Sequence, residues 1–454
     1  MKEKKFYKRI FILTLPIIIQ NLIVQMLNMA DTLMIGRLGE LELAAVGIAN
    51  QYFFMFSLVL FGINAGTSMY IAQYWGKKDK ENIRRMTRIG LQFSLIATSI
   101  FTIIAMRYSK EIISIFNPNE EVVALGSRYL ITVALSYLAT SISISFAFAS
   151  RSIENTFLPM LASIIALGVN IVLNYILIFG KFGFNPMGVE GAAWATVIAR
   201  FIEAITIIIY IYYNKLVIAI NLKKIHIFQI KYISLAIGGI LPILINEIVW
   251  GLGTTTYNII YARLGVSATA TIQITTTVIN LFMIVIFALG NSAMIVVGKE
   301  IGKGDIEAGN LYAKKLCKLS LLIGLFIGIF IFILAPYIVR LFNVNEEILI
   351  AGEKILKINA LILLLRTYVF IMIVGILRGG GDARFGAILQ GLSMWFVGIP
   401  LVYYAAFILK LPLYYVIIFT IAEELIKVIF IVRRFSSGKW INNLVEESKS
   451  FCVN

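Results

Sequence analysis

Long apolar runs, separated by short polar segments rich in lysine and arginine, make up most of the sequence. A helix of about 20 mostly apolar residues crosses the roughly 30 Å of hydrocarbon in a membrane. Twelve runs reach that length, and we predict transmembrane helices at 10–35, 47–75, 87–107, 122–149, 159–180, 188–213, 233–262, 269–298, 311–337, 348–377, 385–409 and 412–434. The pattern therefore predicts an all-α integral membrane protein.

The second half of the sequence repeats features of the first at a constant offset of 226 residues. The offset pairs Pro16 with Pro242, Arg37-Leu38-Gly39 with Arg263-Leu264-Gly265, Gly76 with Gly302, Asp79 with Asp305, Glu81 with Glu307 and Gly126 with Gly352. Each half holds six predicted helices, an even number, so both halves enter the membrane from the same side. We therefore expect two six-helix bundles related as parallel repeats, with a substrate cavity between them and rocking alternating access. The alternative is a duplication that serves stability alone.

The basic residues predict the orientation of the chain. With the N-terminus inside, the basic segments 2–9, 77–88, 215–231 and 433–449 are all cytoplasmic, and the opposite loops carry few such residues. This asymmetry predicts that both termini are cytoplasmic. We expect an N-lobe at 1–213, a cytoplasmic linker at 214–232, a C-lobe at 233–434 and a cytoplasmic tail at 435–454. The basic start continues into the first apolar run without a cleavage site, which indicates a retained helix.

The amino-acid composition is typical of a membrane protein and argues against a nucleic-acid-binding or metal-binding protein. Apolar residues make up 60% of the chain and charged residues 14%, whereas soluble domains have roughly 45–50% and about 25%. The net charge of +16 comes from basic residues between the apolar runs, so it gives no reason to expect a nucleic-acid partner. His226 is the sole histidine, and Cys317 and Cys452 fall in segments predicted to be cytoplasmic, so we expect neither a metal cluster nor a structural disulfide.

Signatures of ATP use and of catalysis are missing from the sequence. Each glycine–lysine pair lacks the hydroxyl residue that completes a P-loop, and neither a His-Glu-x-x-His nor a Gly-x-Ser-x-Gly motif occurs. We therefore expect no enzymatic activity and no cofactor.

Asp31 lies in the outer half of the first predicted helix. A charge at the centre of a membrane helix costs about 2.5–3.5 kcal/mol on insertion scales, and such residues face protein or a water-filled cavity. At spacings of three or four residues, Asn21, Gln25, Asn28 and Asp31 share one face of that helix. This face is therefore predicted to look into a cavity. The alternative is a buried aspartate that neighbouring amides hold as a contact between helices.

Other oxygen-bearing side chains in the first half complete a candidate cation site. The fifth predicted helix carries Asn170 and Asn174 on one face, and the sixth carries Thr196. With Asp31 they would form an oxygen-rich cluster suited to a hard cation such as Na⁺, or to a carboxylate that carries a proton. Arg200 and Glu203 are three residues apart and are expected to form a local ion pair.

Glu247 is the corresponding acid of the second half, at a different depth. The 226-residue offset pairs Glu247 with Asn21 and pairs Asp31 with Tyr257. We expect Glu247 to bind an ion or substrate, the alternative being an ion pair with Arg366 that confines coupling to the N-lobe. The remaining predictions are that Gln25, Asn28, Trp250 and Tyr257 line a substrate cavity and that Glu423, Glu424 and Lys427 are interfacial or paired.

Several of these segments resemble the multidrug and toxic compound extrusion (MATE) family. They are Asp31-Thr32-Leu33-Met34-Ile35-Gly36-Arg37-Leu38-Gly39, Asn170-Ile171-Val172-Leu173-Asn174, Gly191-Ala192-Ala193-Trp194-Ala195-Thr196, the stretch 242–265 and Leu377-Arg378-Gly379-Gly380-Gly381-Asp382. The resemblance covers nearly the whole chain. It implies a two-lobed, V-shaped antiporter that exports amphipathic, often cationic compounds against an inward flow of Na⁺ or H⁺.

The resemblance also implies roles for individual residues. Asp31 would be the coupling carboxylate of the N-lobe, with Asn170 and Thr196 as companions, and Glu247 the acid of the C-lobe. The sequence departs from the family at Asn174, where members often have Asp, and around Arg366, where some sodium-coupled members have Asp. We expect a monomer in a bacterial inner membrane that acts on small drug-like molecules.

Three other functions are weighed against this one. A lipid-linked oligosaccharide flippase of the same superfamily would need a strongly basic cavity, and just two arginines, Arg200 and Arg366, are clearly mid-span. An ion channel would suit the polar first helix, but no filter-like segment is visible. A membrane enzyme has no candidate site.

Overall fold

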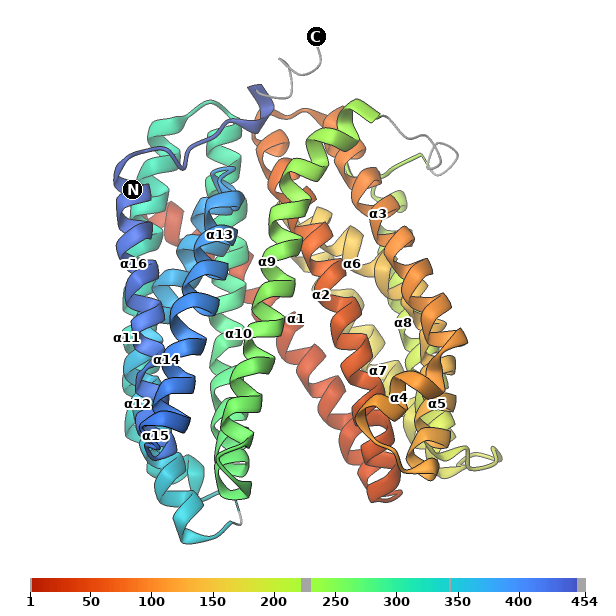
Figure 1. Ribbon diagram of the computed structural model, residues 1–454. Helices are drawn as coiled ribbons and strands as arrows, with labels where there is room; N and C mark the ends of the chain where they lie inside the picture. The colour runs from red at the N-terminus through yellow and green to blue at the C-terminus, as the bar shows by residue number, and fades with distance from the viewer. Residues whose placement is uncertain (1, 222–229, 343, 447–454) are drawn as a thin grey trace. The chain divides into compact units, whose positions relative to one another are not determined.

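The computed structural model describes residues 2–221, 230–342 and 344–446, and within these ranges the regular structure is helical. His226, Cys452 and residues 222–229 of the predicted linker lie outside the described residues. The helices of the first half are α1 (Lys2–Gly36), α2 (Glu40–Lys77), α3 (Lys80–Arg107), α4 (Ser109–Phe116), α5 (Glu120–Ala134), α6 (Ser136–Ser152), α7 (Phe157–Phe179) and α8 (Gly188–Tyr213) (Figure 1).

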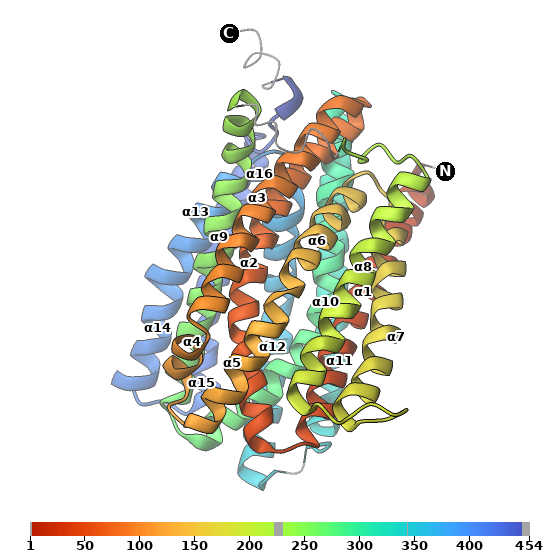
Figure 2. The same cartoon turned by 90° about the vertical axis from the view of Figure 1, so that its right-hand side faces the viewer.

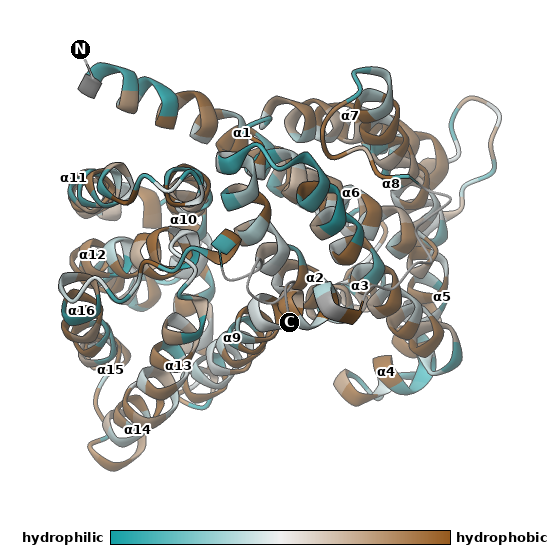
Figure 3. Cartoon of the chain, turned by 90° about the horizontal axis from the view of Figure 1, so that it is seen from above, coloured by the Kyte–Doolittle hydropathy of each residue, from teal (hydrophilic) through white to brown (hydrophobic). Residues whose placement is uncertain are grey.

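The second half contains both α-helices and short π-helical segments. They are α9 (Ile230–Ala262), α10 (Val266–Gly302), α11 (Ile306–Val339), α12 (Glu346–Phe370), η2 (Ile371–Leu377), α13 (Ala383–Ser393), η3 (Met394–Gly398), α14 (Ile399–Tyr403), η4 (Tyr404–Ile408), α15 (Leu413–Ile418) and α16 (Thr420–Ser436). Viewed from above, hydrophobic residues predominate along the helices and hydrophilic ones are more frequent at their ends and in loops (Figure 3).

Among the described residues, ten helices are long and apolar enough to cross a membrane, and a bent pair adds an eleventh span. The pair is α5 and α6, which meet at 49°, so the single helix predicted at 122–149 is wrong. At the bend the Ser136 hydroxyl donates to the Val133 carbonyl at 2.6 Å, the kind of side-chain bond that bends helices. The run predicted at 412–434 is divided between α15 and α16, whose buried Glu423, Glu424 and Lys427 lower its hydropathy.

The starts of the helices confirm the repeat. The helices α2, α3, α5 and α7 begin at 40, 80, 120 and 157, and α10, α11, α12 and α13 begin 226 residues later, at 266, 306, 346 and 383. The caps repeat as well. Asp79 and Asp305 cap α3 and α11, and Asn119 and Asn345 cap α5 and α12, each by accepting a hydrogen bond from a backbone N–H of the first turn.

The chain forms two compact units that exchange short segments. The N-unit comprises Phe11–Ile71 and Asp79–Leu244, and the C-unit comprises Met1–Ile10, Ala72–Lys78 and Ile245–Asn454. The first residues of α1 and the end of α2 thus pack with the second half. The lobe boundaries expected from the sequence remain a prediction.

Within the C-unit, the segment after α16 docks against the end of α2. Trp440 is fully buried, packs over Gly380 and stacks on Phe435 with ring centroids 5.3 Å apart. The Gln73 amide donates to the carbonyls of Gly379 and Asn442, at 3.1 Å each, and its oxygen accepts from the backbone of Leu444 at 2.9 Å. These bonds fix the C-terminal segment to the same unit as α10.

Within the N-unit, α7 and α8 lie side by side (Figure 2). Gly191 of α8 makes this close approach possible, because a Cβ there would lie 2.7 Å from the Leu177 carbonyl group of α7. The contact is between backbones, so neither helix can yield by moving a side chain.

We expect Gly191→Val to push α7 and α8 apart and to lower the free energy of unfolding by about 1–3 kcal/mol, the usual cost of overpacking. Gly168→Ala is the matched control, because a Cβ at this exposed position of α7 meets nothing within 4 Å. Thermal unfolding in detergent measures both variants. Equal melting temperatures for the two would contradict this account of the helix contact.

Candidate functional site

The N-unit brings Asp31 together with both predicted asparagines. The Asn174 amide donates to the Asp31 carboxylate and, at 3.0 Å, to the Asn170 side-chain oxygen. Both asparagines are fully buried. The carboxylate of α1 is therefore held by a carboxamide of α7.

The register of α1 against α7 explains this contact. Gln20 and Asp31 are eleven residues apart on α1, and Ser163 and Asn174 are eleven residues apart on α7. The Gln20 amide donates to the Ser163 hydroxyl at 3.1 Å, while Asn174 reaches Asp31. Two contacts three helical turns apart require α1 and α7 to run in the same direction with matched rise.

Tyr129 and Arg200 interact with Asp31, and Thr196 contacts Tyr129. The buried Tyr129 of α5 forms a side-chain hydrogen bond with Thr196 of α8 and interacts electrostatically with Asp31 and Arg200. The charge of Arg200 also acts on Asp31. Tyr129 is absent from the sequence-based prediction, because one tyrosine on an amphipathic helix carries no signal that distinguishes it from packing.

An unpartnered oxygen makes this site suited to a cation. The side-chain oxygen of Asn174 is buried and accepts no hydrogen bond, although it lies on the residue that holds Asp31. An orphaned buried acceptor costs free energy, and a hard cation prefers carboxylate and carboxamide oxygens. Within the described part of the chain, no group of three or more His, Cys, Asp or Glu could hold a metal ion. The Asp31 carboxylate and the unpartnered Asn174 oxygen are two oxygen groups that could contact a cation, and the carboxylate could take up a proton.

The other polar residues predicted on α1 differ from Asp31 in exposure. Gln25 and Asn28 are exposed, and Asn21 is half-buried. The Asn28 carbonyl accepts from the Thr32 hydroxyl at 2.8 Å. A role for Gln25 and Asn28 in a substrate cavity remains a prediction.

In the C-unit, Glu247 pairs with Arg378 and not with Arg366, the partner named in the alternative interpretation. Arg378, which is 2% exposed, donates to the Glu247 carboxylate at 2.7 Å. Arg366 instead contacts Asn359 at 3.1 Å and Glu424 at 3.7 Å. The alternative of a Glu247–Arg366 pair is therefore wrong, because Arg366 faces α16 while Arg378 enters the unit where η2 ends.

The two units use their arginines in similar ways. Arg151, at the end of α6, donates to Gln20 of α1 at 2.5 Å, and Arg378 donates to Glu247 of α9. By the 226-residue offset, Arg151 corresponds to position 377, next to Arg378, and Gln20 corresponds to position 246, next to Glu247. The two contacts thus occur at nearly equivalent places in the two halves of the repeat.

Tyr257, the counterpart of Asp31, belongs to a second polar cluster. Its hydroxyl donates to Glu423 at 2.6 Å, and its ring stacks on Tyr261. Lys427 forms ion pairs with both Glu423 and Glu424, which confirms that these residues are paired. The predicted Arg200–Glu203 ion pair is also confirmed, at 2.9 Å.

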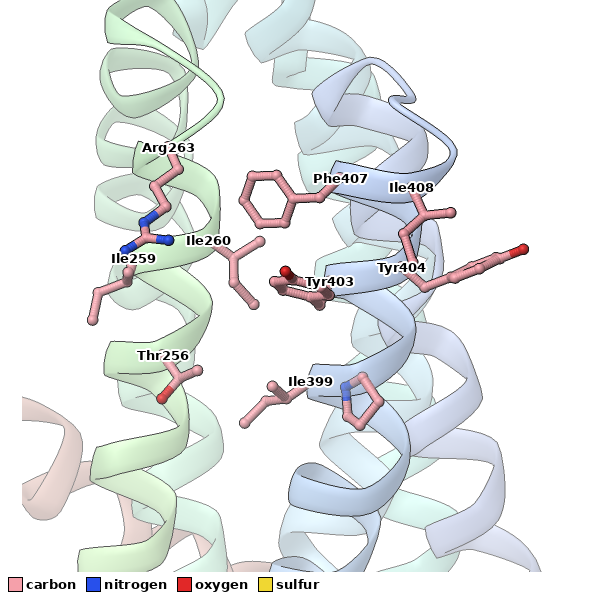
Figure 4. Close-up of a pocket in the computed structure, with 10 residues that line it drawn as sticks. Thr256, Ile259, Ile260, Arg263, Ile399, Tyr403, Tyr404, Phe407 and Ile408 are labelled. Carbon is pink, nitrogen blue, oxygen red and sulfur yellow. The ribbon is translucent and has the colours of Figure 1, made fainter.

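A pocket in the C-unit lies between α9 and the segment α14–η4 (Figure 4). Ile260, Tyr403 and Phe407 point into it, whereas Tyr404 points away. Its lining is mostly apolar, with Arg263 at one end. The residues of the predicted cation site are not among those that line it.

The sequence model of the MatE family matches residues 16–176 and 242–404. A probable multidrug resistance protein NorM of Thermotoga maritima is 28% identical, over 95% of this chain and 93% of its own length. An uncharacterized transporter YisQ of Bacillus subtilis is 24% identical, over 95% and 94%. The fold matches a crystal structure of MATE in the bent conformation with a TM-score of 0.87 at 21% identity, covering 96% of each chain. An outward-facing multidrug resistance MATE transporter matches with a TM-score of 0.85 at 21% identity, covering 95% and 96%.

We expect Glu247→Gln and Arg378→Met each to lower the free energy of unfolding by about 3–5 kcal/mol, because each leaves one buried charge unpaired. The double variant should recover much of the loss, since neither charge remains. Lys357→Gln is the control, because its pair with Glu353 is one-third exposed and exposed pairs contribute little. Thermal unfolding of the four proteins in detergent gives the comparison. Additive losses in the double variant would show that the pair is not energetically coupled.

Proposed function

Because this chain belongs to the MatE family, it is a membrane transporter and not an enzyme, and we propose that it exports small drug-like molecules in exchange for Na⁺ or H⁺. The observation that supports exchange most directly is the contact of Asp31 with Asn174, whose own oxygen is left without a partner. A carboxylate held by an amide keeps its negative charge available to an incoming cation.

The mechanism follows from the charge of Asp31. When a cation or proton binds the carboxylate, its negative charge is cancelled and its attraction for the Asn174 amide weakens. The contact between α1 and α7 then favours a different arrangement, and that change alters the affinity for substrate elsewhere. Coupling of this kind is reciprocal, so substrate binding must weaken cation binding by the same factor.

The substrates that we propose are amphipathic and often cationic. Two relatives bear the names probable multidrug resistance proteins NorM and YoeA. Aromatic rings attract organic cations across their faces, and Trp250 and Tyr257 of α9 are half-buried. In the N-unit, the exposed Gln25 and Asn28 would offer polar contacts to such compounds. Glu247 and Arg366 remain candidates for ion or substrate contacts in the second half.

The arginines of the spans argue against recognition of a diphosphate. Arg200 is paired with Glu203, Arg366 lies 3.7 Å from Glu424, and Arg378 is bonded to Glu247. A flippase for lipid-linked sugars needs basic groups that are free to bind phosphate, and these three are engaged by carboxylates.

The cellular setting is also proposed. The chain is a multi-pass membrane protein. We place it as a monomer in the inner membrane of a bacterium with both termini in the cytoplasm, because the basic segments favour that orientation. The N-lobe at 1–213 and the C-lobe at 233–434 would then be the two moving bodies.

The decisive test is Asp31→Asn in proteoliposomes, with a Na⁺ gradient and a pH gradient imposed in separate experiments. We expect the unaltered protein to accumulate a fluorescent organic cation under one of the two gradients. The variant should lose this uphill transport, because an amide has no negative charge to bind a cation and does not take up and release a proton.

The control is Glu353→Gln, which removes a carboxylate from the partly exposed pair with Lys357 on α12 and should transport normally. Uphill transport by Asp31→Asn at the rate of the unaltered protein would rule out the proposed site. The gradient that drives uptake identifies the coupling ion.

A further inference from the structure

A buried ion pair lies on the same face of α8 as the candidate site. Thr196, Arg200 and Glu203 follow one another at spacings of four and three residues. The Arg200 guanidinium donates to one Glu203 oxygen at 2.9 Å. The two side chains are 16% and 7% exposed, so little water screens their charges.

A chain of hydrogen bonds fixes Glu203 from the other side. Arg151 donates to the Gln20 oxygen at 2.5 Å, Gln20 donates to the Ser163 hydroxyl at 3.1 Å, and Ser163 donates to the second Glu203 oxygen at 2.9 Å. Arg151 also interacts electrostatically with Glu203. Both oxygens of Glu203 therefore accept hydrogen bonds, one from Arg200 and one from Ser163.

Arg200 interacts with two carboxylates, by a hydrogen bond with Glu203 and through its charge with Asp31. It is bonded to Glu203, and its charge also acts on Asp31 and on Tyr129 of α5. A guanidinium that swung from Glu203 to Asp31 would occupy the carboxylate that the proposed cation uses. The four charges of Asp31, Arg200, Glu203 and Arg151 sum to zero, so the group has no net charge whether Arg200 lies on Glu203 or on Asp31.

We propose that Arg200 is a tethered competitor of the coupling cation at Asp31, and that Glu203 sets the strength of this competition by holding the guanidinium away. Glu203 is thus a positioning residue, fixed by Ser163, Gln20 and Arg151, and it touches neither cation nor substrate. When Asp31 is occupied, Arg200 stays on Glu203. When Asp31 is empty, Arg200 neutralises it, which lowers the cost of leaving a bare carboxylate inside the membrane.

This inference rests on the proposed exchange function and makes opposite predictions for two neighbouring residues. Arg200→Gln removes the competitor and should lower the half-saturating cation concentration at least about fivefold, a typical coupling between sites. Glu203→Gln releases the competitor and should raise that concentration by a similar factor. In the double variant the competitor and its tether are both absent, so the concentration should match that of Arg200→Gln. Arg200→Lys retains a cation and should lie close to the unaltered protein.

The experiment measures export of a fluorescent organic cation by full-length protein in proteoliposomes as a function of Na⁺ concentration and, separately, of pH. Half-saturation and maximal rate are reported for each variant, because a purely structural defect would lower the rate without moving half-saturation in opposite directions. Lys357→Gln serves as the control, since it also removes one partner of an ion pair between neighbouring helix turns.

The outcomes separate this inference from the function on which it rests. If the unaltered protein depends on a cation through Asp31, but Arg200→Gln and Glu203→Gln leave half-saturation unchanged, the competition is refuted and the exchange function stands. If the unaltered protein shows no dependence on either cation, both fail together. Should Glu203→Gln not fold, the shift in Arg200→Gln alone decides the matter.

Discussion

A charge in the hydrocarbon region must be neutralised by a partner, and the polar interior of this protein depends on that constraint. Glu203 is bonded to Arg200, Glu247 to Arg378, and Glu423 to Lys427. Asp31 differs, because its hydrogen-bond partner is the neutral amide of Asn174. A paired acid stabilises its helix contacts, whereas an acid held by an amide retains its charge for a mobile ion. By this distinction the paired glutamates have a structural role, whereas Asp31 is the carboxylate of this set that we propose for cation exchange.

The repeat gives the two halves one framework and different interiors. Helix starts and caps recur at a fixed offset, and in both halves an arginine at the end of the fourth span reaches a polar residue of the first span. At the position of Asp31, however, the second half has Tyr257, whose hydroxyl donates to an acid that already has a lysine. In the second half, Glu247 and Glu423 are thus paired with basic residues of that same half, Arg378 and Lys427. The architecture is symmetric, and the chemistry of exchange is not.

The sequence predicted the fold well because apolar runs and a register of 226 residues are properties of the chain alone. The family resemblance is confirmed, and the structure brings Asn174 into contact with both Asp31 and Asn170. Helical spacing predicts that the two asparagines share a face, whereas their place beside Asp31 depends on how α1 packs on α7. The alternative partner weighed for Glu247, Arg366, was wrong, since the identity of a partner depends on how helices rotate against one another. The bend at Ser136 and the contact of Tyr129 with Thr196 had no sequence signal either. Such features arise from tertiary packing, which a pattern along one helix does not record.

The docked segment after α16 determines where this chain can be shortened. Trp440 covers Gly380, and the backbone of 442–444 satisfies both ends of the Gln73 amide. A protein truncated before Trp440 would leave the apolar surface over Gly380 bare and would take from Gln73 two of its three partners. Val445 is the last residue of the described chain whose side chain is buried. Purification tags and fusion partners therefore belong after it. The same burial makes Trp440 an intrinsic fluorescent reporter for any rearrangement at this end of the molecule.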